Sequence, residues 1–302
     1  MKRIIIFLGL IFFAFWCCFA EQAKVAIVLS SDIEPYRIAL RGFDDYFKEK
    51  KMTLSVSEYN LQKEDASAVF SKIKNEKPNI ILTVGTKATK EAKDKINDIP
   101  IIFSMILDPS EFTGPKATGV SLKIPPEMEI KILKSIIPKV KKIGVIYSKE
   151  SQADVNKATL SCQSLNLELV STKVESEEQV PKAIRDIIKN IDALFMIADS
   201  VVYTKNSTQD ILLTTLREGI PVFGISPQYV KAGAVFCLSC DYEDIGKQTG
   251  EIALKVLSGT SPSDIPVNYP RKTLLFLNLV TAQRIGIEIP KEILDKAKEV
   301  YK

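Results

Sequence analysis

The chain has 302 residues, of which 41 are lysine or arginine, 37 are aspartate or glutamate and none is histidine. Without histidine it cannot build a Ser-His-Asp or Cys-His nucleophile, or a zinc or haem site with histidine ligands. Proton transfer near pH 7 also lacks its commonest agent. The composition therefore favours binding over catalysis, and the length favours two folded domains.

The first 20 residues have the pattern of an export signal. Two basic residues precede an uncharged, mostly apolar run over 4–15, which is too short for a comfortable membrane span. Cleavage after Ala20 fits this pattern. A lipid anchor on Cys17 or Cys18 is the alternative, although the bulky Trp16 stands where a small residue is preferred. We expect an exported protein, either periplasmic or on the outer cell surface.

Loss of residues 1–20 removes two of the basic residues and leaves 39 against 37 acidic ones. This balance argues against nucleic acid or an anionic membrane as the main partner. Cys237 and Cys240 have C-x-x-C spacing, but they lie in a strand-like stretch over 234–240. Alternation places them on opposite faces of a strand, so we expect two buried small residues and no metal or redox site.

The rest of the chain alternates strand-like and helix-like segments. The first series predicts strands at 25–29, 54–59, 80–84, 101–105 and 119–122, and helices at 34–50, 66–75 and 87–96. The second predicts strands at 143–147, 167–172, 193–197, 221–223 and 234–238, and helices at 126–137, 152–165, 180–188 and 206–218. The third predicts helices at 241–258, 281–285 and 291–301, and strands at 265–267 and 273–277.

Such alternation is typical of α/β proteins with parallel sheets built from βαβ units. Because the pattern occurs twice without a long Pro/Gly/Ser linker, we expect two Rossmann-like lobes joined by several short hinge segments. The predicted first lobe contains residues 21–120 and 241–274, and the second contains 121–240 and 275–302.

In open α/β sheets, ligands bind beyond the carboxyl ends of the strands. The residues predicted at these ends are rich in hydroxyls and carboxylates. In the first lobe they are Ser30, Ser31, Gly85, Thr86, Ser104 and Asp108. In the second they are Tyr147, Ser148, Ser151, Ala198, Asp199, Ser200 and Ser226, with Asp241 and Tyr242 where the chain leaves that lobe.

Two groups of residues in this set could bind the charged ends of a ligand. Gly85 and Thr86 join a strand to a helix, and with Thr86 as N-cap the first helical turn would hold a carboxylate; an ordinary capped turn is the alternative. Asp108, Asp199 and Asp241 could each neutralise a ligand ammonium, or could serve as turn residues or helix caps.

Several stretches resemble the family of ABC transporter substrate-binding proteins that includes binders of tryptophan and tyrosine. The resemblance rests on GISPQYVKAG at 224–233 and DYEDIGKQTGE at 241–251, with further matches at 81–86, 102–109 and 142–147. Its most specific part is residues 231–265. The resemblance implies a type I periplasmic-binding fold with three crossovers, closure on a small ligand and delivery to a membrane permease with an ATPase. Asp199-Ser200 stands where the family often has Asp-Asn, a departure that bears on ligand preference.

We therefore expect a solute-binding protein of an ABC importer that closes on a zwitterion, with an aromatic amino acid preferred. We expect a monomer without cofactor, metal, catalytic residue or nucleic-acid partner. A sensory protein with the same lobes that signals to a membrane receptor is the alternative. A carboxylate-dependent hydrolase and a DNA-binding regulator fit less well. With no histidine, ligand affinity is expected to vary little between about pH 6 and 8 unless a shifted group lies in the site.

Overall fold

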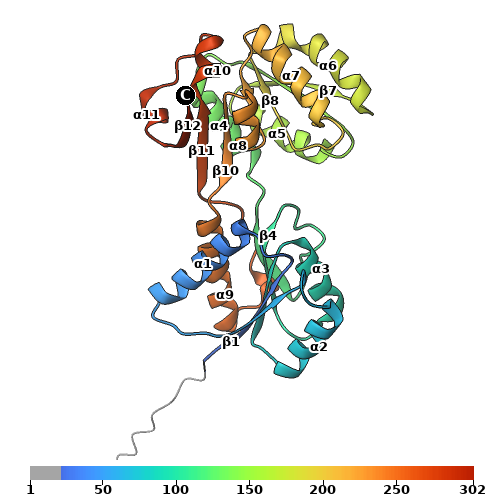
Figure 1. Cartoon of the computed structure of the whole chain (residues 1–302), viewed down its shortest axis with the longest axis vertical. Helices are drawn as coiled ribbons and strands as arrows, with labels where there is room; N and C mark the ends of the chain where they lie inside the picture. The colour runs from blue at the N-terminus through green and yellow to red at the C-terminus, as the bar shows by residue number, and fades with distance from the viewer. Residues whose placement is uncertain (1–21) are drawn as a thin grey trace, which may run out of the picture.

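Two β-sheets, one in each of two lobes, organise residues 22–302, the part of the chain that this computed structural model describes. The predicted signal at 1–20, with Cys17 and Cys18, lies outside the described residues. Figure 1 shows the lobes one above the other with a narrow waist between them. The two-lobed α/β architecture predicted from the sequence is confirmed.

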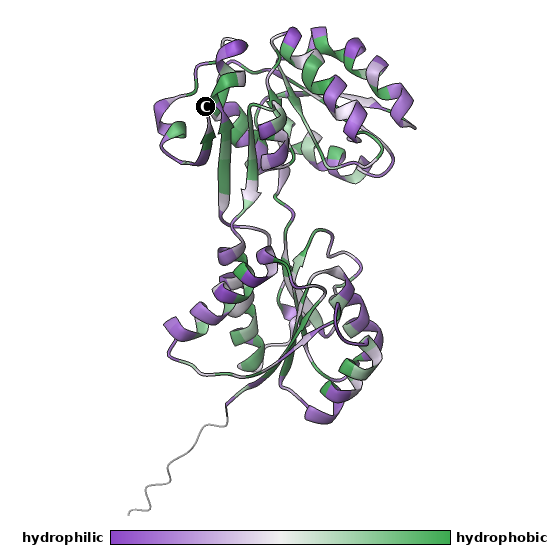
Figure 2. Cartoon of the chain, in the orientation of Figure 1, coloured by the Kyte–Doolittle hydropathy of each residue, from purple (hydrophilic) through white to green (hydrophobic). Residues whose placement is uncertain are grey.

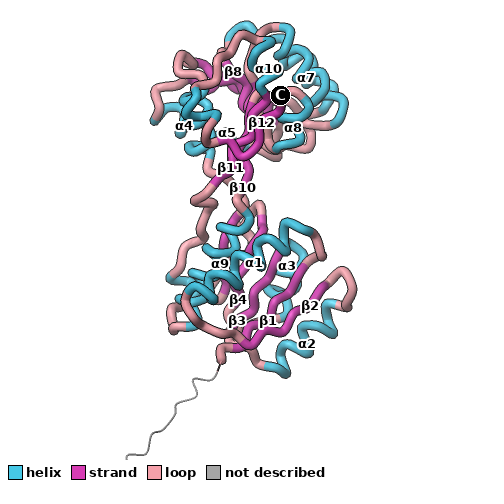
Figure 3. The backbone as a smooth tube through the Cα atoms, turned by 60° about the vertical axis from the view of Figure 1, so that its left-hand side comes forward, coloured by secondary structure: helices cyan, strands magenta, loops and turns pink. Residues whose placement is uncertain are grey.

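The first lobe has a five-stranded parallel sheet of order β2-β1-β3-β4-β5 within the described residues. Its strands are β1 (Lys24–Leu29), β2 (Ser55–Asn60), β3 (Ile80–Val84), β4 (Ile101–Ile106) and β5 (Ala117–Ser121). Its helices are α1 (Glu34–Glu49), α2 (Ala66–Glu76), α3 (Thr86–Lys95) and α9 (Tyr242–Leu257). Helices cover both faces of this sheet (Figure 3).

Strand β1, which lies between β2 and β3, is apolar from Val25 to Leu29 because both of its faces are covered. Val25, Ile27 and Leu29 are buried in one cluster with side chains of α1 and α9. Ala26 and Val28 point the other way and are buried with side chains of α2 and α3. Figure 2 shows helices of both lobes with hydrophobic and hydrophilic residues alternating along their length.

Helix α9 belongs to the first lobe although it follows the strands of the second in sequence. It packs directly on α1 because glycines allow the backbones to touch. A Cβ at Gly246 would lie 1.8 Å from the carbonyl oxygen of Ala39, and a Cβ at Gly42 would lie 2.0 Å from that of Glu243. Replacing either glycine would separate the two helices.

The second lobe has a seven-stranded sheet of order β12-β11-β10-β9-β8-β6-β7 in the described part of the chain. Its strands are β6 (Lys142–Tyr147), β7 (Glu168–Lys173), β8 (Ala193–Phe195), β9 (Val222–Phe223), β10 (Phe236–Cys240), β11 (Thr273–Asn278) and β12 (Ala297–Tyr301). Its α-helices are α4 (Pro126–Ile136), α5 (Gln152–Ser164), α6 (Val180–Ile187), α7 (Lys205–Arg217), α8 (Pro227–Ala232), α10 (Leu279–Arg284) and α11 (Lys291–Leu294).

Short 3-10 turns complete the list of helical segments. They are η1 (Glu177–Gln179), η2 (Ile188–Asn190) and η3 (Pro262–Asp264). None of these helices or turns, within residues 22–302, has the length and apolar character needed to cross a bilayer.

Residues 22–302 cross between the lobes three times: between β5 and α4, between β10 and α9, and between α9 and β11. These crossings explain why the second sheet is mixed and not parallel as predicted. Strand β10 leaves the second lobe and β11 re-enters it, so the two neighbours run antiparallel. The remaining strand pairs of this sheet are parallel.

Two predictions near the carboxyl end were wrong. Residues 291–301 do not form one helix: α11 ends at Leu294, and β12 then pairs in parallel with β11 at the sheet edge. An open ladder next to β11 offers residues 297–301 backbone partners, which outweighs the helix preference of Ala297, Lys298 and Glu299. No strand forms at 265–267. The next residue but one after Pro266, Asn268, makes an isolated bridge with Val120. Helix α8 was not predicted.

Candidate functional site

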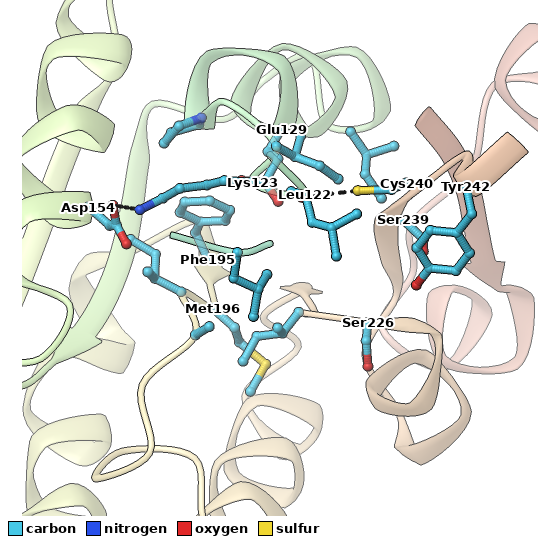
Figure 4. A pocket seen from close by; sticks show the side chains of 17 residues that line it. Leu122, Lys123, Glu129, Asp154, Phe195, Met196, Ser226, Ser239, Cys240 and Tyr242 are labelled. Atoms are coloured by element: carbon cyan, nitrogen blue, oxygen red, sulfur yellow. Dashed lines mark hydrogen bonds and ion pairs between the residues drawn. The ribbon is translucent and has the colours of Figure 1, made fainter. Parts of the chain in front are cut away.

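A cavity of about 250 Å³ lies at the junction of the lobes, beyond the carboxyl ends of β8, β9 and β10. We call it the hinge cavity, and Figure 4 shows its lining. The lining residues are Leu107, Leu122, Lys123, Ile124, Pro126, Glu129, Asp154, Phe195, Met196, Ile197, Ala198, Ile225, Ser226, Leu238, Ser239, Cys240 and Tyr242. Most belong to the second lobe or the first crossing, while Leu107 and Tyr242 come from the first lobe.

One wall of the hinge cavity is apolar. Phe195, Met196 and Ile197 follow one another at the end of β8, and Leu238 lies in the middle of β10, which β9 separates from β8. Leu122 faces them from the first crossing. Such a surface favours an aromatic or aliphatic group of a ligand, because burial removes apolar area from water.

Charged groups of the lining gather where the first crossing meets α4 and α5. Lys123 of the crossing forms an ion pair with Asp154 of α5. Glu129, in the first turns of α4, lines the same side. Burial, with the negative charge of Asp154 as a second cause, raises the pKa of Glu129 to about 8. A carboxyl group with this pKa is mostly protonated at neutral pH.

Hydroxyl and thiol groups complete the lining. Ser226, Ser239 and Tyr242 lie together at one end of the hinge cavity in Figure 4. The Cys240 thiol donates a hydrogen bond of 3.0 Å to the carbonyl oxygen of Leu122. Burial, and to a lesser degree the charge of Glu129, raises the pKa of Cys240 to about 12, so this thiol is neutral.

Of the site residues predicted from the sequence, Ala198, Ser226 and Tyr242 line the hinge cavity. Tyr147 is half-buried and packs on the core of the second lobe. Ser200 is exposed, and its backbone N–H and hydroxyl donate to the Glu150 carboxylate at 3.0 and 2.7 Å.

Asp199 is buried in a loop of its own lobe and accepts several hydrogen bonds there. The Ser148 backbone N–H and hydroxyl donate to it at 2.7 and 3.0 Å, and the Ser151 hydroxyl donates at 2.5 Å. The backbone N–H groups of Val201 and Val202 donate to it at 3.0 and 3.2 Å. This arrangement favours Asp199 as a residue that holds its loop together over Asp199 as a partner of the ligand ammonium, because its lone pairs are already occupied.

Burial opposes ionisation of Asp199, but the hydrogen bonds from Ser151 and Ser148 outweigh it and hold the pKa of Asp199 below its usual value. The other two predicted aspartates also have local partners. Asp241 caps α9 by accepting from the Asp244 N–H at 3.2 Å. Asp108 accepts from the Ser110 N–H at 2.9 Å in an exposed turn, and this bond lowers the pKa of Asp108.

The predicted residues of the first lobe meet at the start of α3. Gly85, and not Thr86 as predicted, is the N-cap, and its φ of 89° is one that glycine adopts without strain. The Ser30 hydroxyl accepts from the Ala88 N–H at 2.9 Å, and Ser31 follows it, half-buried. Thr86 is exposed in the first turn of the helix.

Ser104 is only 2% exposed, and its hydroxyl lies 3.0 Å from that of Thr249 in α9. It therefore belongs to the interior of the first lobe. Cys237 and Cys240 are free and buried, and they lie in different core clusters, as expected for opposite faces of β10. Within residues 22–302, no group of three His, Cys, Asp or Glu residues could hold a metal ion.

Sequence reasoning missed Lys123, Glu129 and Asp154. The available signal was a lysine and two glutamates around the start of a helix that follows the first crossing. Asp154 comes from the next helix, and only the folded second lobe places it beside Lys123.

Two α/β lobes, three crossings and a cavity at their junction define a two-lobed binding protein of the type I periplasmic-binding fold. The chain belongs to the family described as ABC transporter substrate binding protein, which matches residues 38–301.

Individual relatives agree with this assignment. A tyrosine-binding protein of Clostridioides difficile (strain R20291) is 28% identical over 233 residues, which are 73% of this chain and 67% of the relative. An uncharacterised Rickettsia prowazekii protein is 22% identical over 264 residues, which are 86% of this chain and 84% of the relative.

Among solved structures, a substrate-binding protein with adhesive properties from Clostridium difficile, in its ligand-free, open form, matches with a TM-score of 0.78 at 23% identity. The match covers 93% of this chain and 99% of that one. A domain from Streptococcus pneumonia in complex with L-Trp matches with a TM-score of 0.60 at 21% identity, covering 92% and 99%. Both matches support the fold.

Proposed function

We propose that this protein is the solute-binding component of an ABC importer and that it closes on an aromatic amino acid in the hinge cavity, for delivery to a membrane permease. The observation that carries the proposal is the composition of that cavity, which is lined by many apolar side chains together with two carboxyl groups and one lysine. A ring fits the first and the charged end of an amino acid fits the second. The tyrosine and L-Trp named for the two relatives support this ligand class.

Closure would bring the first lobe to the ligand. The start of α3, where Gly85 and Thr86 lie, offers backbone N–H groups of a first helical turn, which suit the ligand carboxylate. Contacts made only when both lobes touch the ligand shift the population towards the closed form. The second lobe would then hold the ring and the ammonium, and the first lobe the carboxylate.

Thermal unfolding of purified residues 21–302 tests the proposal. L-tyrosine, L-tryptophan and L-phenylalanine are compared with L-leucine, D-ribose and adenosine. An aromatic amino acid at a hundred times its Kd should add about 2.7 kcal/mol to the free energy of unfolding, a rise of several degrees in Tm. A larger rise with ribose or adenosine would overturn the choice of ligand, and no rise with any of the six compounds would overturn the proposed function.

A further inference from the structure

Building on the proposed function, we infer that Glu129 receives the ammonium group of the ligand and releases a proton to water when the ligand binds. The inference begins with which carboxylates in and around the hinge cavity have partners. Asp199 accepts hydrogen bonds from the Ser148 backbone N–H and the Ser151 hydroxyl of the loop between β6 and α5. Asp241 accepts one from the Asp244 N–H of α9. Asp154 lines the hinge cavity but is paired with Lys123.

Glu129 differs from these groups. Within residues 22–302 its carboxyl group makes no hydrogen bond or ion pair, yet its side chain lines the hinge cavity and is half-buried. Glu127, two residues before it on α4, shows the contrast: it is exposed and pairs with Lys131 at 2.5 Å. Glu129 is therefore the carboxyl group of this cavity that still lacks a cationic partner, and a ligand ammonium would supply one.

The surroundings of Glu129 determine its charge before the ligand arrives. Asp154 of α5 faces it with a negative charge, and Lys123 of the first crossing is already paired with that aspartate. On β10, the Cys237 and Cys240 thiols are held neutral by burial. Tyr242 of α9 also has its pKa raised by burial. None of these five groups supplies Glu129 with an unpaired positive charge.

Glu129 itself is the group that titrates near neutral pH, with a pKa of about 8. In the ligand-free protein at pH 7 it is mostly a neutral carboxylic acid. An ammonium placed against it favours the carboxylate and lowers its pKa. The proton on the carboxyl oxygen then passes to water, while the ammonium keeps all of its own protons.

This coupling makes affinity depend on pH. Between pH 6 and 7.5 neither end of an α-amino acid titrates, so a change in affinity there reports on the protein. Each pH unit below the pKa of Glu129 should weaken binding up to about tenfold, because a proton must first be removed. The expectation that affinity is flat near neutral pH, drawn from the missing histidine, is therefore replaced by a specific slope.

The test is isothermal titration calorimetry of residues 21–302 with L-tyrosine, L-tryptophan and L-phenylalanine at pH 6.0, 6.75 and 7.5. Measurements in phosphate and in imidazole at each pH give the number of protons released, because the two buffers differ in ionisation enthalpy. The wild type should release close to one proton per ligand and should bind more than tenfold more tightly at pH 7.5 than at pH 6.0. Glu129→Gln should release none and show a flat profile.

Glu127→Gln is the matched control and should behave like the wild type, since its carboxyl group lies outside the hinge cavity. Circular dichroism establishes that each variant is folded, and the proton count of the wild type does not depend on any variant. Binding without proton release, or a slope that survives in Glu129→Gln, would overturn the inference while leaving the proposed function intact. Failure of all three amino acids to bind would overturn both.

Discussion

Cys240 and Leu122, 118 residues apart in sequence, are joined by a hydrogen bond of 3.0 Å from the thiol to the carbonyl oxygen. Leu122 follows β5 at the first crossing, and Cys240 ends β10 at the second. The bond therefore ties two crossing segments together next to the hinge cavity. The same contact shows that Cys240 serves as a buried hydrogen-bond donor.

The cysteines should be unreactive in the folded protein. Burial raises the pKa of Cys162 to about 11 and the pKa values of Cys237 and Cys240 to about 12. At pH 8 the thiolate fraction is then about a thousandth or less. Ellman's reagent should modify residues 21–302 slowly at pH 8 and should titrate three thiols after denaturation in guanidinium. Rapid modification of one thiol in the native protein would contradict this.

The sequence predicted local order better than long-range partners. Continuous apolar runs such as Ile80–Val84 and helices with one apolar face were found because their periodicity depends on neighbours in the chain. The segment Ala297–Tyr301 was misassigned because its strand state depends on pairing with β11. The direction of β11 likewise follows from where the chain returns between lobes, which no local pattern encodes.

The candidate site was likewise predicted only in part. Ala198 and Ser226, predicted from strand-end reasoning, line the hinge cavity, because the carboxyl ends of parallel strands meet at one edge. It could not show that Asp199 is surrounded by donors from its own loop and from the loop after β6, or that Glu129 lacks a partner. Both facts depend on distances between helices and loops that are set by packing.

The unliganded protein should become less stable as pH rises because of Glu129. Its pKa is about 8 in the folded protein and 4.5 as the ordinary value, so the folded state binds the proton more tightly. The free energy of unfolding therefore falls between about pH 4.5 and pH 8. Glu129→Gln should match the wild type near pH 5 and exceed it by roughly 1–3 kcal/mol at pH 8.5.

Urea unfolding at pH 5.0, 7.0 and 8.5 measures this effect. Glu127→Gln, which changes an exposed carboxylate on the same helix, should not gain stability relative to the wild type as pH rises. If the Glu129→Gln and wild-type curves ran parallel across this range, the raised pKa of Glu129 would be refuted.

Asp199 should contribute to stability more than to ligand affinity. Its pKa is lowered in the fold, so its contribution is complete above the ordinary value of 3.8 and is lost as pH falls through the lower folded value. Asp199→Asn removes a buried charge acceptor from Ser148 and Ser151, and should cost about 2–4 kcal/mol at pH 7.

Thermal unfolding measures the contribution of Asp199 to stability, and calorimetry measures its contribution to ligand affinity. Ligand affinity of the folded variant should stay within about threefold of the wild type. Ser200→Ala, at the exposed neighbour, is the control and should change stability by less than about 0.5 kcal/mol. A Tm equal to that of the wild type with a hundredfold loss of affinity would instead assign Asp199 to the ligand.

Gly246→Ala should disrupt the contact that holds α9 on the first lobe. The new Cβ would lie 1.8 Å from the Ala39 carbonyl oxygen, which is backbone and cannot swing away. We expect a loss of about 2–4 kcal/mol in the free energy of unfolding from overpacking.

Gly114→Ala is the matched control, because no atom lies within 4 Å of its added Cβ, and it should be nearly neutral. Since both ends of α9 lead into crossings, a displaced α9 should also shift the hinge and weaken ligand binding. Equal Tm values for the two variants would show that α1 and α9 can separate without cost.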